Sequence, residues 1–164
     1  MIFRGFFGCV FAALFCLSSY AGRIVWDEYY DPEMAIAKVS YFSKKLNKVV
    51  TEEKRNTWAP GHGIGGAYNR HTKKVEWKAS WNNNRSIAGV YNPNTKTVEW
   101  KENWNFGRHI GGAYNARTGM IEWRESFNPG KSIAGVYNPD TEAIEWRESF
   151  RPIHNIYGIY VKDD

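Results

Sequence analysis

Apolar and polar positions along this chain recur with a period of 23 residues from Ile64 to the C-terminus. Isoleucine, glycine, tyrosine and Glu-Trp columns all keep this step. The columns hold Ile64, Ile87, Ile110, Ile133 and Ile156; Gly66, Gly89, Gly112, Gly135 and Gly158; Tyr68, Tyr91, Tyr114, Tyr137 and Tyr160; and the Glu-Trp pairs that begin at 76, 99, 122 and 145. Self-similarity at a short fixed period predicts stacked supersecondary units rather than one irregular core.

Each unit carries the pattern of a β-hairpin. Two short runs rich in β-branched and aromatic residues, such as residues 133–138 and 143–150, flank a turn sequence. The turn sequences Asn-Pro-Asn-Thr at 92–95 and Asn-Pro-Asp-Thr at 138–141 place proline where a type I turn favours it. The sequence therefore predicts one hairpin in every unit.

The connections between units are as short as the turns within them. Pro129 and Gly130 fit a type II turn, which requires a positive φ angle at its third residue. Gly61, Asn84 and Gly107 hold the equivalent positions and tolerate a left-handed backbone. Because strands joined by tight turns run antiparallel, the sequence predicts an all-β, up-and-down antiparallel meander of about six tandem hairpins.

The repeat extends upstream of the regular units in a degenerate form. Residues 23–39 align in register with residues 120–136. A helix over residues 32–50 is an alternative, because Asp31-Pro32 suits a helix start and apolar residues follow at helical spacing. The match of register favours a hairpin there.

The repeat domain is expected to begin with a second-strand segment at 24–30 and to end with a first-strand segment at 156–161. Pairing of these two half-hairpins would close the meander into a barrel or ring and remove both exposed sheet edges. A 46-residue super-period is also present, because GGAYN and AGVYN alternate in successive units. A β-trefoil therefore stays open as an alternative to the ring.

The N-terminal residues have the layout of a cleavable secretory signal peptide. Arg4 is followed by an apolar run over residues 5–17 and by small residues at Ser19 and Ala21. We expect residues 1–21 to be a signal peptide and the product to be secreted or periplasmic. Both cysteines of the chain fall inside this segment, so disulfides and thiol chemistry are not expected in the exported domain.

The exported part, residues 22–164, is expected to form a single β-hairpin-repeat domain. It comprises degenerate repeats at 23–63, four regular repeats at 64–154 and a closing strand at 155–164. The formal charge of +5 is mild and acidic residues occur in every repeat, so nucleic acid is not an expected partner. No cofactor or metal is expected, because the four histidines lack a metal-ligand spacing.

Three repeated columns carry the candidate ligand-binding residues. They are the tryptophans Trp77, Trp100, Trp123 and Trp146; a charged ladder of Glu76, Glu99, Glu122 and Glu145 with Lys78, Lys101, Arg124 and Arg147; and the tyrosines Tyr68, Tyr91, Tyr114 and Tyr137. The tryptophans form either a core stack against glycine or a row of exposed stacking platforms. The ladder is either a solvated face with cross-strand ion pairs or part of several equal pockets for a small polar ligand. Sugars fit such pockets, because hydroxyl groups need hydrogen-bond partners while the C–H face of the ring needs an aromatic side chain.

The sequence resembles the MORN repeat family, whose hairpin units have a similar 23-residue length. Trp100, Trp104 and Gly107 show its pattern of two aromatic residues followed by a glycine, and the similarity covers most of residues 64–154. The family's glycine between the paired aromatic residues is replaced here by Glu102, Glu125 and Glu148 or their neighbours. The resemblance implies a binding or scaffolding module with lipid or protein partners, no catalytic centre, and an open sheet as an alternative fold.

We predict a secreted, non-catalytic, lectin-like protein with repeated equivalent sites for carbohydrate, because linked weak sites gain avidity without new contacts. An enzyme is not expected, because catalysis needs a unique constellation of groups, whereas almost every polar residue here has several copies. The alternatives are a MORN-like scaffold that binds a protein partner or an anionic membrane surface, and a structural or coat protein.

Overall fold

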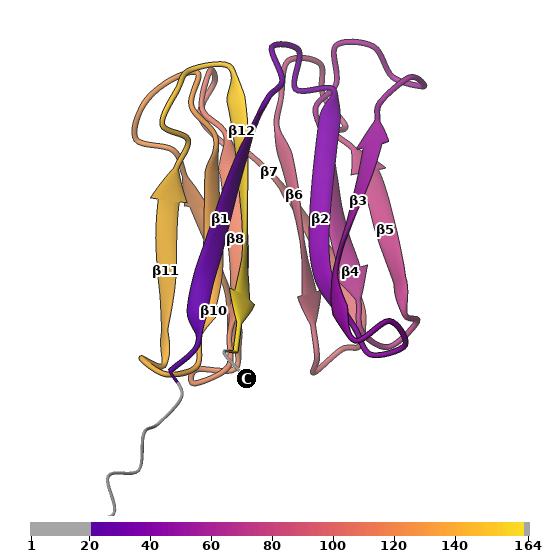
Figure 1. Cartoon of the computed structure of the whole chain (residues 1–164). Coiled ribbons are helices and arrows are strands. Elements are labelled where there is room, and N and C mark those ends of the chain that lie inside the picture. Colours follow the sequence, from indigo (N-terminus) through magenta and orange to yellow (C-terminus); the bar gives the residue numbers. More distant parts are fainter. Residues whose placement is uncertain (1–20, 163–164) are drawn as a thin grey trace, which may run out of the picture.

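The computed structural model describes residues 21–162, which fold into twelve β-strands and no helix. The strands are β1 (Arg23–Tyr30), β2 (Ile36–Ser43), β3 (Lys48–Arg55), β4 (Ile64–Asn69), β5 (Lys74–Ala79), β6 (Ile87–Asn92), β7 (Thr97–Glu102), β8 (Ile110–Asn115), β9 (Met120–Glu125), β10 (Ile133–Asn138), β11 (Ala143–Glu148) and β12 (His154–Val161). Consecutive strands from β2 to β11 pair as five antiparallel hairpins, and β1 pairs with β12 to form a sixth (Figure 1). No helix long and apolar enough to cross a membrane occurs in this part of the chain.

The structure confirms the all-β prediction in its main elements. Strands β2 and β3 form a hairpin where a helix was the alternative, and the two end segments, β1 and β12, pair over their whole length. The connecting loops contain the predicted left-handed residues, with φ angles of +77° at Gly61, +56° at Asn84 and +76° at Gly107. The predicted signal peptide lies outside the described residues, apart from Ala21.

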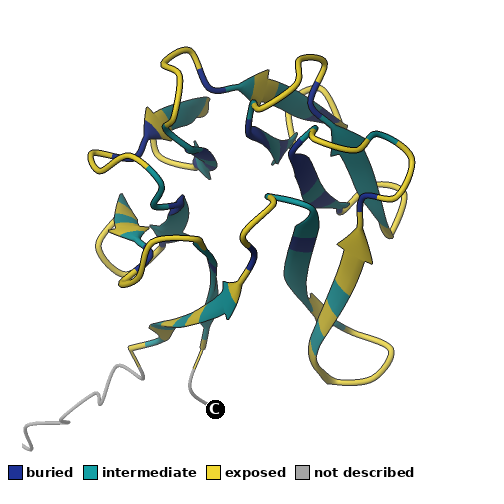
Figure 2. Ribbon diagram, turned by 90° about the horizontal axis from the view of Figure 1, so that it is seen from above, coloured by how far each residue is buried: buried dark blue, intermediate teal, exposed yellow. Residues whose placement is uncertain are grey.

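The hydrogen-bonded sheet itself does not close, because ladders link strands only within each hairpin and so form six separate two-stranded sheets. The hairpins instead stand face to face around a central axis, like blades (Figure 2). The inner strands β2, β4, β6, β8, β10 and β12 contact one another in that order, and β12 also contacts β2. Packing of faces holds the ring together, since each hairpin has apolar or small side chains on both faces and needs a partner for each.

Cross-strand pairs of glycine and tryptophan fill the interfaces between hairpins. Trp26, Trp77, Trp100, Trp123 and Trp146 lie opposite Gly158, Gly66, Gly89, Gly112 and Gly135, respectively. A Cβ atom at Gly89 would lie 2.6 Å from Cζ3 of Trp100, and one at Gly112 would lie 2.5 Å from Cε3 of Trp123. The missing side chain therefore allows each indole to lie directly over the backbone of its own hairpin.

The 46-residue super-period corresponds to two alternating contacts between neighbouring inner strands. At one kind of interface, a valine packs on the glycine of the next hairpin: a Cβ atom at Gly112 would lie 2.7 Å from Cγ2 of Val90. Val39 packs on Gly66 in the same way, and Val136 packs on Gly158. At the other kind, a Cβ atom at Gly65 would lie 2.6 Å from the carbonyl oxygen of Ile87, so two backbones approach closely. The small residue in GGAYN is needed for this approach.

A column of glutamates fastens four of the six connecting loops to the hairpins that follow them. Glu125 is buried and accepts hydrogen bonds from the backbone N–H groups of Trp104 and Asn105 and, at 2.7 Å, from the side-chain amide of Asn105. Glu102 holds residues 81 and 82 in the same way, Glu148 holds residues 127 and 128, and Glu28 holds residues 150 and 151. Hydrogen bonds to a carboxylate are strong because they are charge-assisted. These glutamates, called the clamp glutamates below, include the three at which the chain departs from the MORN pattern.

Two loops lack this clamp, because Arg55 occupies the glutamate column in β3 and Ala79 occupies it in β5. In the loop before β2, the carboxylate of Asp31 accepts hydrogen bonds from the N–H groups of Ala35 and Ile36. The loop before β4 is held from within instead. The buried side chain of Asn56 accepts a hydrogen bond from the N–H of Ala59 and donates to the carbonyl oxygens of Ala59 and His62. The degenerate unit thus reaches the same loop geometry with a local bond set.

Replacing Glu125 by alanine would remove the acceptor of three N–H donors in the preceding loop. We expect Glu125→Ala to lower the free energy of unfolding by about 2–3 kcal/mol, because donors that lose a charged acceptor are costly to leave unpaired. Urea denaturation measures this difference. Glu33→Ala, at an exposed glutamate of another loop, is the control and should change the free energy by less than about 0.5 kcal/mol. Equal effects of the two substitutions would contradict the clamp.

Candidate functional site

The four predicted tryptophans lie half-buried between hairpins. Each shares a hairpin face with its opposing glycine and with the predicted tyrosine of the same unit, because alternate residues of a strand point to the same side. The opposite face of each hairpin from β2–β3 to β10–β11 meets the tryptophan-bearing face of the next one. At one interface the Arg124 guanidinium lies 5.0 Å from the ring centroid of Trp146. The structure therefore uses these indoles in the packing between blades.

The predicted glutamates hold the hairpin turns. The side-chain amides of Asn69, Asn92, Asn115 and Asn138 donate to Glu76, Glu99, Glu122 and Glu145 at 2.5–2.7 Å. The amide oxygens of the same asparagines accept hydrogen bonds from backbone N–H groups inside the turns. Since the glutamates and the basic residues lie on the face opposite the tryptophans, one hairpin alone does not bring the predicted glutamate, tryptophan and cation together.

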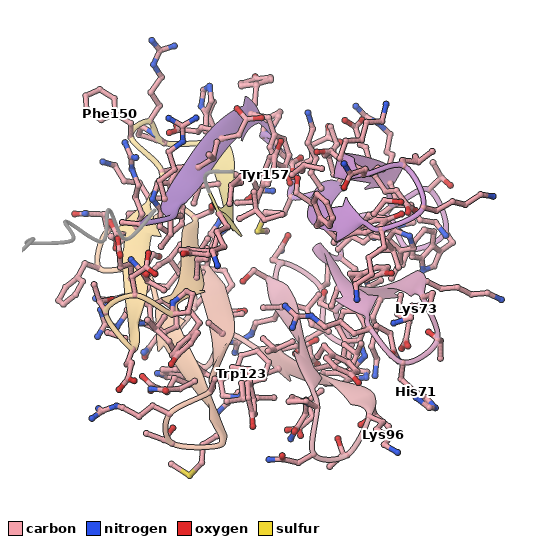
Figure 3. The ribbon with its side chains drawn as sticks, turned by 60° about the horizontal axis from the view of Figure 1, so that its bottom comes forward. His71, Lys73, Lys96, Trp123, Phe150 and Tyr157 are labelled. Atoms are coloured by element: carbon pink, nitrogen blue, oxygen red, sulfur yellow. The ribbon has the colours of Figure 1, made fainter. Side chains whose placement is uncertain are left out.

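A second column of aromatic residues is exposed at the end of the ring where the connecting loops lie. It consists of Tyr30, Trp58, Trp81, Trp104, Phe127 and Phe150, here called the aromatic rim. Trp58 is the least exposed of these side chains, at 50%, and Phe150 the most, at 81%. Each member ends or follows an outer strand, so the rim has one member per hairpin. Figure 3 shows the ring of Phe150 projecting away from the strands.

Hydrogen bonds hold the backbone of most loops that carry the rim. The clamp glutamates accept hydrogen bonds from the backbone N–H groups of Trp81, Trp104, Phe127 and Phe150. Three of the rim rings also carry a cation: the ammonium groups of Lys54, Lys78 and Lys101 lie 5.0, 4.5 and 5.2 Å from the ring centroids of Trp58, Trp81 and Trp104. A cation over an aromatic face is attracted by the ring quadrupole. All three rings are therefore accompanied by a hydrogen-bond donor, and those of Trp81 and Trp104 are also positioned by their clamped backbone.

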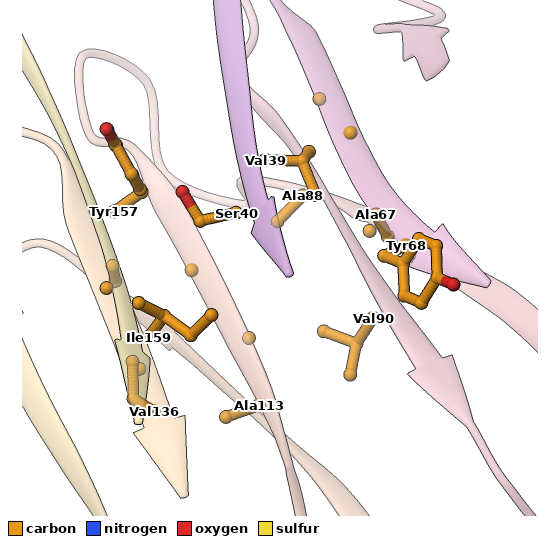
Figure 4. Close-up of a pocket in the computed structure, with 18 of the residues that line it drawn as sticks. Val39, Ser40, Ala67, Tyr68, Ala88, Val90, Ala113, Val136, Tyr157 and Ile159 are labelled. Atoms are coloured by element: carbon orange, nitrogen blue, oxygen red, sulfur yellow. The ribbon is translucent and has the colours of Figure 1, made fainter. Parts of the chain in front are cut away.

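The inner strands surround a central channel of about 1300 Å³. Small and aliphatic side chains, such as Ala67, Ala113 and Val90, line its wall (Figure 4). The predicted tyrosines Tyr68, Tyr91, Tyr114 and Tyr137 line it as well. Tyr41 stacks on Tyr68, with 3.9 Å between the ring centroids and an interplanar angle of 2°.

Backbone groups make the channel more polar than its side chains suggest. In the β4–β5 hairpin the N–H of Ser80 donates to the carbonyl of Gly63, and the N–H of Lys73 donates to that of Asn69. Odd-numbered residues of β4 therefore direct their backbone groups toward β5, and the intervening residues Gly66 and Tyr68 direct theirs to the other edge. That edge faces the channel, so amide and carbonyl groups line it together with small side chains.

The aromatic rim is the feature that the sequence interpretation missed. Its 23-residue spacing from Trp58 to Phe150 was visible, but the residues lie in loops, where the alternation of a strand does not indicate which way a side chain points. Within residues 21–162, no group of three or more His, Cys, Asp or Glu side chains is arranged to hold a metal ion. Burial lowers the pKa of His109, which lies beside the channel.

No protein-family model, characterised protein or solved structure matches the chain. The resemblance to MORN repeats therefore stays a prediction from the motif, and function has to be argued from the geometry alone.

The rim tryptophans and the glycine-backed tryptophans should differ in their access to solvent. We expect iodide to quench the emission of Trp58, Trp81 and Trp104 far more than that of the other five tryptophans, because only these three are exposed. Substitution Trp104→Phe should reduce the quenchable fraction of the emission, whereas Trp100→Phe, four residues earlier, should raise it slightly, because it removes an emitter that iodide does not reach. Steady-state fluorescence of the two variants measures this difference. A loss of quenching in Trp100→Phe alone would show that Trp100, and not Trp104, is the exposed residue.

Proposed function

We propose that this protein is a secreted, non-catalytic, lectin-like binding protein whose aromatic rim binds carbohydrate at several equivalent positions. The observation that supports this most is the recurrence of one exposed aromatic side chain per hairpin at one end of the ring. Soluble proteins rarely expose so many large aromatic residues without a partner. The proposed platforms are these loop residues, and the predicted tryptophans pack between the hairpins.

The chemistry of a rim position suits a sugar ring. The exposed face of an indole or phenyl ring can pack against the C–H face of a pyranose, and nearby amides and cations can bond its hydroxyl groups. Beside Trp81, for example, the exposed residues Asn83 and Asn84 and the ammonium group of Lys78 provide such partners. The clamp glutamate reduces the entropy lost on binding, because the loop is already ordered.

Repetition around a ring favours a multivalent ligand. A single stacked sugar contributes little affinity, but sites fixed on one rigid frame bind successive units of a polysaccharide or a glycan-coated surface with gains in avidity. The proposed ligand is therefore polymeric or surface-bound carbohydrate rather than a free monosaccharide at the rim.

An anionic membrane surface is the second candidate. Phe106 and Phe150 are 76% and 81% exposed, and Arg108 and Arg151 lie close to them in the same loops. Aromatic residues next to cations on one end of a molecule are typical of peripheral membrane binding.

Removal of rim rings should weaken binding to a polyvalent glycan stepwise. On a glycan array with the purified protein, we expect Trp104→Ala to reduce binding several-fold and the combined change Trp81→Ala, Trp104→Ala and Phe127→Ala to reduce it by about 100-fold, since avidity multiplies the losses. Met120→Ala, which truncates an exposed apolar side chain at the opposite end of the ring, is the matched control. Absence of binding to every glycan at high valency would rule out the proposal.

Liposome flotation separates the two candidates. Binding to vesicles of phosphatidylserine and phosphatidylcholine that falls steeply between 0.05 and 0.5 M salt, about the range over which screening of exposed charges becomes severe, would favour the membrane. Glycan binding through stacking should change little over the same salt series. Flotation without glycan binding would replace the first candidate by the second.

A further inference from the structure

One interface of the ring differs in composition from the other five. It lies between the β1–β12 hairpin and the β2–β3 hairpin and is called the seam here. In the five other hairpins a glycine lies opposite a tryptophan, but in the β2–β3 hairpin Lys38 lies opposite Glu53, and their charged atoms are 3.3 Å apart. On the other side of the seam, Tyr157 occupies the column that holds Gly65 and Gly111 elsewhere. The seam therefore lacks both the indole and the small residue that close the other interfaces.

The channel extends outward at the seam. Strands β12 and β2 are the most loosely packed neighbours of the ring, and Figures 1 and 2 show them standing apart. Among the described residues that line the channel, Tyr29 of β1 is the only one from an outer strand. A ligand that enters the channel could reach past the inner strands only here.

The walls of the seam present hydroxyl groups, a carboxylate and two aromatic rings. The hydroxyl of Tyr157 donates to Asp27 at 2.5 Å, and the hydroxyl oxygens of Ser40 and Thr51 are 2.7 Å apart. Tyr157 and Ser40 face the same space in Figure 4. The ring centroids of Tyr29 and Tyr157 are 6.0 Å apart, with a tilt of 54°.

The ammonium group of Lys38 is paired within the seam, and the carboxylate of Asp27 leaves the seam negatively charged. Lys38 lies 4.7 Å from the ring centroid of Tyr29 and is neutralised by Glu53. Burial and then the charge of Asp31 raise the pKa of Tyr29, and burial and then the hydrogen bond to Asp27 raise the pKa of Tyr157. Both phenols therefore keep their protons at neutral pH. Each donates its single O–H within the protein, Tyr29 to the carbonyl oxygen of Ile36 and Tyr157 to Asp27, and its oxygen can still accept a hydrogen bond. The carboxylate of Asp27 disfavours an anion and can accept hydrogen bonds from the hydroxyl groups of a neutral ligand.

We propose that the seam binds one neutral polyol, a sugar residue or a cyclitol, against the rings of Tyr29 and Tyr157, with Asp27, Ser40 and Thr51 as partners of its hydroxyl groups. This site is singular in a molecule whose other features are repeated. It does not depend on the aromatic rim, and it accepts a soluble monomer, whereas the rim requires a multivalent ligand.

The test is isothermal titration of the purified protein with glucose, galactose, mannose, N-acetylglucosamine and myo-inositol, each as a free monomer. We expect at least one of these probes to saturate at one molecule per chain. Tyr157→Phe keeps the ring and removes the hydroxyl, and should weaken that binding by about tenfold, as expected for loss of a hydrogen bond with the ligand and of the bond that orients Asp27. Ser40→Ala, on the opposite wall, is the second variant and should also weaken it.

Matched controls separate this site from the rest of the molecule. Tyr114→Phe makes the same chemical change elsewhere in the channel and should leave the affinity unchanged. Trp104→Ala should leave it unchanged as well, while it weakens polyvalent glycan binding, so the seam and the rim can fail independently. Thermal melting checks that each variant is folded. No saturable binding of any probe, or equal affinities of Tyr157→Phe and Tyr114→Phe, would overturn the proposal, and binding of myo-inositol alone would assign the seam to cyclitols rather than sugars.

Discussion

The packing of a tryptophan over a glycine on the opposite strand is the contact on which this structure depends. A two-stranded hairpin is marginally stable alone, so each unit must bury both faces against its neighbours. The glycine lets the indole lie over the backbone, which keeps the blade thin enough to stand beside the next one, and valines such as Val90 then reach the same glycine from the neighbouring hairpin. The clamp glutamates complete the arrangement, because each ties a loop to the following blade. Pairing of β1 with β12 gives the last inner strand its partner and connects the two ends of the chain.

The same constraint determines which residues are available for binding. Tryptophans that support the blades are half-buried, and the glutamates beside them are held by asparagines of the hairpin turns, so the repeated Glu-Trp pair is first a structural element. Exposed aromatic residues remain at the loop end, where the clamp glutamates fix their backbone. Six similar loops on one rigid ring suit a polyvalent ligand, and the seam, where the glycine and tryptophan pair is absent, provides the only interface of a different chemistry among the described hairpins.

Much of this fold could be predicted from the sequence. The features that could not be predicted were missed for physical reasons that can be named. The period located the hairpins, the turn residues Gly61 and Asn84 have the predicted positive φ angles, and the register of 23–39 indicated that β1 and β12 would pair. Alternation along a strand shows which face is apolar but not which edge is hydrogen-bonded, so the division into separate two-stranded sheets could not be foreseen. The clamp of Glu125 joins groups about twenty residues apart, and the rim lies in loops that have no periodic signal of orientation. The seam could have been found, because Glu53 interrupts the tryptophan column, but only once the degenerate unit was known to be a hairpin.

Amide hydrogen exchange, followed residue by residue by NMR, tests the ring most directly. If the end strands complete a blade, the amides of β1 that face β12 should be protected to a degree comparable with those that link β8 and β9, since both pairs would open only with the ring. Exchange of the β1 amides at the rate of an unstructured peptide, while β8 and β9 stay protected, would show that the two ends of the chain do not pair and that the blades form an open row.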